Sequence, residues 1–118
     1  MRLVIAAVVT MMTSAAMADD IADAHRQAVA GRDSYWNCLA REYTRDGNRS
    51  LSGRDFTSLI VSACPSERQN FRVTLVDYLS MQFPGDDAGS AMTTANNAIA
   101  LAQKEIVTEF IRHKEASK

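Results

Sequence analysis

Apolar residues recur at helical spacing along most of the chain, in stretches separated by polar residues and turn formers. Between residues 54 and 63, apolar side chains fall at i, i+3, i+4 and i+7, which places them on one face of a helix. The last stretch repeats apolar residues every three or four positions, alternating small and large side chains. This pattern predicts an all-α fold, a small four-helix bundle with helices over about 20–45, 54–63, 66–82 and 87–115.

The breaks between these stretches carry turn chemistry. Residues 45–53 are rich in turn formers and form the predicted main loop. Ser52, three residues before Asp55, resembles the start of a capping box for the second helix. Inside the first helix, Gly31 costs about 1 kcal/mol relative to alanine, so we expect this helix to bend or break there.

The N-terminal 18 residues have the anatomy of a secretory signal peptide. A positive start precedes an apolar run over residues 3–12, and small residues end the segment at Ala16 and Ala18. A bilayer-spanning helix needs about 20 apolar residues, and this run is shorter and interrupted by hydroxyl residues. The sequence therefore predicts a signal peptide over 1–18 and a single helical domain over 19–118. This domain is expected to be periplasmic or secreted, with no membrane span in the mature chain.

Two cysteines are present, and an exported protein encounters an oxidising compartment. We therefore predict a disulfide between Cys38 and Cys64, which stabilises the fold by about 3.5 kcal/mol in the chain-entropy model. The functional alternative is a redox-active pair, but such pairs usually have C-x-x-C spacing. Trp36 is expected to pack beside this disulfide, with its N–H directed to a partner or to water.

Charge is close to balanced over the chain, with 13 basic and 14 acidic residues. Loss of Arg2 with the signal peptide leaves a slightly acidic mature chain. Arginines are frequent between Arg26 and Arg72, but acidic residues are interspersed among them. A nucleic-acid binder needs a denser basic stripe with aromatic residues in it, so no nucleic-acid partner is predicted.

The loop over residues 44–55 resembles an EF-hand calcium loop, because oxygen-bearing side chains alternate along it and a helix lies on each side. Three positions depart from that pattern: Thr44 stands at the first acidic ligand position, Arg49 at the glycine position, and Asp55 where a longer, bidentate glutamate is usual. The other interpretation is a capped connection with similar turn composition. If the loop holds a metal, its candidate ligands are Asp46, Asn48, Ser50 and Asp55.

Catalytic groups are scarce. The only histidines are His25 and His113, and the chain has no nucleophile elbow, zinc-protease motif or phosphate-binding glycine loop. Glu109 and His113 stand at i, i+4 and are able to share a metal with Glu105, although a surface ion pair is the commoner outcome of such spacing. We expect no enzymatic activity and no cofactor.

Three short segments carry a resemblance: residues 35–38 (YWNC), 60–64 (IVSAC) and 67–71 (ERQNF). Together they resemble the two cysteine segments of the small acid-activated periplasmic chaperones. This resemblance implies an exported helical protein with one disulfide that holds client proteins under stress, after losing a dimer at low pH. The interval between the cysteines is shorter here, and the alanine-rich final helix has no counterpart in that family.

These observations predict a small exported, non-enzymatic helical protein that binds protein clients or another protein partner. A stress-related, chaperone-like role is the specific form of this prediction. The alternative is a weak calcium-binding module built on residues 44–55. The apolar stripe of the final helix also leaves a homodimer open, although alanine at every second seam position is weak for a coiled coil.

Overall fold

The computed structural model describes the backbone of residues 2–117 and the side chains of residues 17–117. This part of the chain contains helices and no strand, which confirms the predicted all-α bundle. Helices α2 to α4 lie within one residue of their predicted bounds. The elements are α1 (Arg2–Thr44), the 3-10 turn η1 (Asp46–Asn48), α2 (Gly53–Ser62), α3 (Pro65–Gln82) and α4 (Ala88–Ala116).

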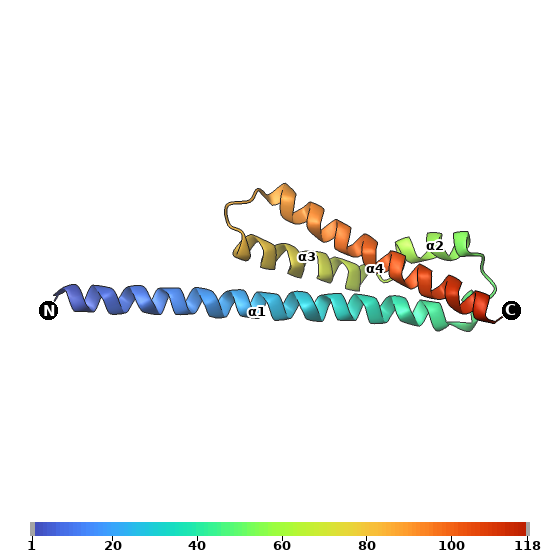
Figure 1. Cartoon of the computed structure of the whole chain (residues 1–118), viewed down its shortest axis with the longest axis horizontal. Coiled ribbons are helices and arrows are strands. Elements are labelled where there is room, and N and C mark those ends of the chain that lie inside the picture. Colours follow the sequence, from blue (N-terminus) through green and yellow to red (C-terminus); the bar gives the residue numbers. More distant parts are fainter. Residues whose placement is uncertain (1, 118) are drawn as a thin grey trace.

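Helix α1 is longer than predicted and extends past the other helices, which gives the molecule an elongated shape of 78 × 23 × 22 Å (Figure 1). It runs without interruption through residue 20, where the first helix was predicted to begin. The side chains of residues 17–20 are exposed, and Ile21 is the first partly buried residue after them. Most of the predicted signal peptide, residues 1–16, lies outside the part of the chain whose side chains are described.

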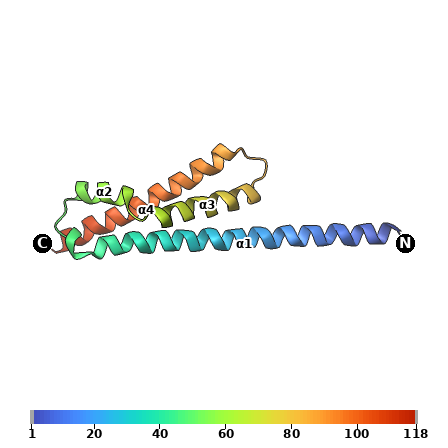
Figure 2. The ribbon, with the colours of Figure 1, turned by 180° about the vertical axis from the view of Figure 1, so that it is seen from behind.

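Helix α3 runs back along α1, and the two helices share the most extensive contact in the fold (Figure 2). Gly31 lies buried at the point of closest approach. A Cβ atom at Gly31 would lie 2.7 Å from Oγ1 of Thr74 and 3.2 Å from Cα of Phe71. The predicted break at Gly31 is therefore wrong: the glycine continues the helix and gives room to the backbone of α3.

Helix α4 starts beside α3 and approaches the C-terminal part of α1 towards its own end (Figure 1). There the rings of Tyr43 and His113 meet edge to face, 5.6 Å apart. Helix α2 covers the same part of α4, with the ring of Phe56 stacked on that of Phe110 at 3.9 Å. The final stretch of α4 is thus held from two sides.

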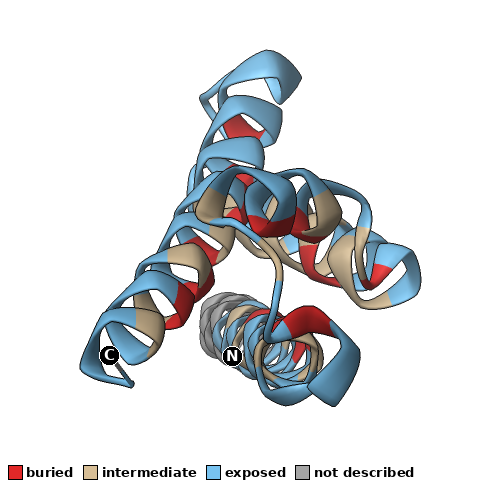
Figure 3. Ribbon diagram, turned by 90° about the vertical axis from the view of Figure 1, so that its right-hand side faces the viewer, coloured by how far each residue is buried: buried red, intermediate tan, exposed pale blue. Residues whose placement is uncertain are grey.

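The core lies along the inward faces of the helices, where the buried residues line up (Figure 3). All buried side-chain polar atoms in the described part of the chain have a hydrogen-bond partner. One such bond crosses the core, from Nε2 of Gln103 to the hydroxyl of Tyr35 at 3.0 Å. The largest fully buried side chains are Tyr35, Leu39, Phe56, Ile60 and Ile106.

Candidate functional site

The predicted disulfide is present. Cys38 of α1 is bonded to Cys64, with a Cα–Cα distance of 6.2 Å and an S–S distance of 2.02 Å. Cys64 occupies the sharp corner between α2 and α3, where its φ of 55° lies in the left-handed region, and Pro65 then opens α3. The bond fastens this corner to the middle of the bundle.

Contrary to the prediction, Trp36 does not pack beside the disulfide. Residues two apart on a helix differ by about 200° around its axis, so Trp36 points away from the side of α1 on which Cys38 bonds to Cys64. The indole is 37% exposed and lines a hollow of about 470 Å³ between α1 and α4. We call this the Trp36 hollow. Its lining residues are Trp36, Ala40, Tyr43 and Thr44 of α1 with Glu105, Ile106 and Glu109 of α4.

A second hollow, of about 500 Å³, lies at the end of the same helix pair and shares Tyr43 and Thr44 with the first. We call it the His113 hollow. Its remaining lining residues are Arg49, Phe110, His113, Lys114 and Ser117. The His113 hollow is bordered by basic groups, whereas the Trp36 hollow is bordered by the carboxylates of Glu105 and Glu109.

The charged groups around these hollows differ in how they are engaged. Glu109 accepts a hydrogen bond from Nη1 of Arg112 at 2.8 Å. Lys114 donates to the carbonyl of Leu51, and its Nζ lies 5.7 Å from the centre of the Phe110 ring. Glu105 has no ion-pair partner among residues 17–117. Its carboxylate is therefore available at the border of the Trp36 hollow.

The two histidines are far apart in the fold and each meets a tyrosine. His25 packs edge to face on Tyr78 of α3, with ring centres 5.0 Å apart, and His113 does the same on Tyr43. No carboxylate lines the His113 hollow within the described part of the chain. Each histidine is thus positioned by an aromatic contact with a tyrosine on a neighbouring helix.

The predicted metal candidates on α4 do not converge either. Among residues 17–117, the only group of three or more His, Cys, Asp or Glu side chains with ligand atoms within 4.8 Å is Cys38, Cys64 and Glu67. Two members of that group are joined in the disulfide. Glu109 pairs with Arg112 instead of sharing a ligand with His113.

The candidate calcium loop is closed by its own side chains. Nδ2 of Asn48 donates to the carbonyl of Glu42 at 2.9 Å and to its carboxylate at 3.1 Å. Asp46 pairs with Arg49 at 3.5 Å and is 92% exposed. Oγ of Ser52 accepts from the amide of Asp55, which is the predicted cap of α2. Ser50 lies exposed in the turn between η1 and α2. Of the four candidate ligands, two are thus engaged in local contacts of the connection.

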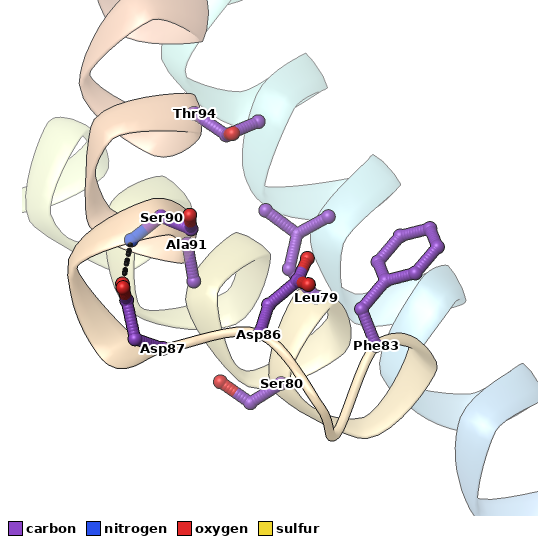
Figure 4. A pocket seen from close by; sticks show the side chains of 8 residues that line it. All are labelled: Leu79, Ser80, Phe83, Asp86, Asp87, Ser90, Ala91 and Thr94. Atoms are coloured by element: carbon purple, nitrogen blue, oxygen red, sulfur yellow. Dashed lines mark hydrogen bonds between the residues drawn. The ribbon is translucent and has the colours of Figure 1, made fainter.

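A smaller hollow of about 130 Å³ lies where α3 turns into α4 (Figure 4). The carboxylate of Asp87 accepts from the amide of Ser90 at 2.8 Å and caps α4, as Figure 4 shows. The side chain of Phe83 is 50% exposed on the other side of this hollow. Two polar residues that line this hollow, Asp87 and Ser90, thus form the start of α4.

The chain was compared with protein-family models, curated protein sequences and solved structures, and none of them matches it. In the part of the chain from residue 17 to 117, no helix is long and apolar enough to cross a membrane. The candidate site therefore rests on its own geometry, and its centre is the Trp36 hollow.

Proposed function

We propose that this protein is an exported, non-enzymatic binding protein that holds segments of other proteins on its surface, with a chaperone-like role under stress. The observation that carries the proposal is the position of Trp36. A large aromatic side chain, part exposed in a hollow of about 470 Å³, is the kind of anchor that dominates protein recognition.

The rest of the surface supports binding to loosely folded clients. Large apolar side chains are exposed on or directly after each of the three helices that follow α1, and they are scattered over different faces. Dispersed apolar contacts suit a protein that holds many sequences weakly better than one that recognises a single surface. These side chains are Val61, Val73, Met81, Phe83, Met92, Leu101 and Ile111.

Export is the second part of the proposal, and two features support it. The disulfide between Cys38 and Cys64 is stable in oxidising compartments such as the periplasm or the extracellular space. Cleavage after Ala18 would also remove no buried side chain among the described residues, because Met17 and Ala18 are both exposed. A mass spectrum of the exported protein is expected to give a chain starting at Asp19, and recovery of the uncleaved chain from the cytoplasm would contradict export.

Client binding is tested with the oxidised, purified protein and a chemically unfolded model client, from neutral to strongly acidic pH. The protein is expected to suppress light scattering by the aggregating client. Trp36→Ala should weaken this protection, while Leu101→Ala, which truncates a more exposed apolar residue on the outer side of α4, should weaken it less. Absence of protection at every pH would overturn the proposal.

A further inference from the structure

The Trp36 hollow combines two features that together select one kind of ligand. Trp36 and Tyr43 supply aromatic rings on the α1 side, and Glu105 and Glu109 supply carboxylates on the α4 side. Aromatic faces attract cations through their ring quadrupole, and carboxylates add direct charge attraction. A hollow with both is complementary to a positively charged group that also has a flat or apolar body.

The carboxylates favour a cation that carries N–H donors. A quaternary ammonium group cannot donate a hydrogen bond to Glu105, whereas a guanidinium donates up to five and stacks on an aromatic face. Lysine donates too, but as a compact, strongly hydrated charge that stacks less well. The chemistry of the lining therefore favours an arginine side chain.

Two of the protein's own arginines near the hollow already pair with acidic residues. Arg32, one helical turn before Trp36, donates from Nε and Nη2 to Asp33 at 3.2 Å. Arg112 is bonded to Glu109. The charge of Glu109 is therefore balanced by Arg112, whereas that of Glu105 has no ion-pair partner in the described part of the chain.

We propose that the Trp36 hollow is a docking site for an arginine side chain presented by a segment of a partner polypeptide. The guanidinium lies against the indole of Trp36 and donates to the carboxylate of Glu105. Apolar residues beside that arginine contact Ala40, which is partly buried and lines the hollow. The proposal rests on the proposed client-binding function and adds a preferred residue to it.

Trp36 is also the natural reporter, because it is the only tryptophan in the chain. Its fluorescence is followed while the full oxidised protein is titrated with a short peptide that carries one arginine between leucines. The matched peptide has citrulline in place of arginine, which keeps the shape and removes the charge. The arginine peptide is expected to bind about fivefold more tightly, since it adds an exposed ion pair and a cation–π contact.

The protein variant Glu105→Gln should lower the affinity for the arginine peptide about threefold and leave that for the citrulline peptide unchanged. Glu115→Gln, an exposed change farther along α4 and outside the hollow, is the control and should alter neither affinity. Circular dichroism of each variant confirms that the fold is kept. Equal binding of both peptides, or no effect of Glu105→Gln, would overturn the inference.

Two further results would each indicate a different occupant of the Trp36 hollow and would also overturn the inference that it binds an arginine side chain. If N-acetylarginine amide alone binds as tightly as the peptide, the hollow takes a small cation and not a polypeptide. If Trp36 emission changes with protein concentration before any peptide is added, a second copy of the chain occupies the hollow. Failure of the docking site is distinguishable from failure of the proposed function, because client protection is then kept while the arginine preference is absent.

Discussion

The hydroxyl of Tyr35 accepts a hydrogen bond from Nε2 of Gln103 at 3.0 Å, and this contact joins α1 to α4 across 68 positions of sequence. Tyr35 is fully buried and lies next to Phe71 of α3, with ring centres 6.3 Å apart. Three helices therefore meet at one tyrosine. Its burial raises the pKa of the Tyr35 hydroxyl, and the bond to Gln103 and the charges of Arg68 and Arg72 oppose the rise.

Tyr35 gives a prediction for alkaline pH. Because its pKa is raised above the ordinary value of 10.0, the folded state holds the proton more tightly than the unfolded chain does. This contribution to stability is complete below pH 10 and is lost as pH rises above it, by at most about 1.4 kcal/mol per pH unit. Urea unfolding of the wild type and Tyr35→Phe is expected to show a steeper alkaline loss in the wild type. Parallel curves would contradict this role.

Gly31 gives a prediction of unusual sign. In an exposed helix interior, glycine to alanine stabilises by about 1 kcal/mol. Here the new Cβ would meet Oγ1 of Thr74 and the backbone at Phe71, so Gly31→Ala should destabilise by about 1–3 kcal/mol. Thermal unfolding of the double variant Gly31→Ala, Thr74→Ala separates the two contacts. This variant removes the contact with the Thr74 hydroxyl and keeps the contact with the Phe71 backbone. A stabilised Gly31→Ala protein would show that α1 and α3 are not this close.

The disulfide is expected to supply a large part of the stability. Its cysteines are 26 residues apart, so replacing both by alanine should cost about 3.5 kcal/mol in the free energy of unfolding. Alanine at position 64 also has to adopt the left-handed conformation that Cys64 adopts at φ 55°. The matched variant Cys38→Ala, Cys64→Gly should therefore be more stable than the double-alanine variant by about 1 kcal/mol. Denaturant melts of the two variants compare them directly, and equal stabilities would refute the backbone argument.

The loop over residues 44–55 gives opposite predictions for its two interpretations. Asn48→Asp adds a carboxylate ligand, and a calcium site should then bind more tightly and raise the melting temperature. In the observed contacts, the new carboxylate would face that of Glu42 and lose a donor, which destabilises by about 1–3 kcal/mol. We expect the melting temperatures of the wild type and the variant to be unchanged by millimolar calcium. A calcium-dependent rise in either protein would restore the metal-site interpretation.

The sequence by itself determined the number of helices, three of their four spans and the pairing of Cys38 with Cys64. Helical periodicity and turn chemistry are local, and with two cysteines in a chain only one intramolecular bond is available, so these features need no knowledge of the tertiary arrangement. The caps at Ser52 and Asp87 were predictable for the same reason, because a cap acts on amides within three residues of it.

The tertiary structure alone decided what Gly31 and Trp36 do. Local propensity marks Gly31 as a weak point, but its surroundings include the backbone of α3, some forty residues away in the sequence. Trp36 is a large aromatic residue of the kind that usually packs in a core. It lines a hollow together with Glu105 only because α4 passes beside this part of α1. Burial and charge at such positions depend on which helices become neighbours. The packing of the whole chain determines those neighbours, and residue spacing within one segment does not.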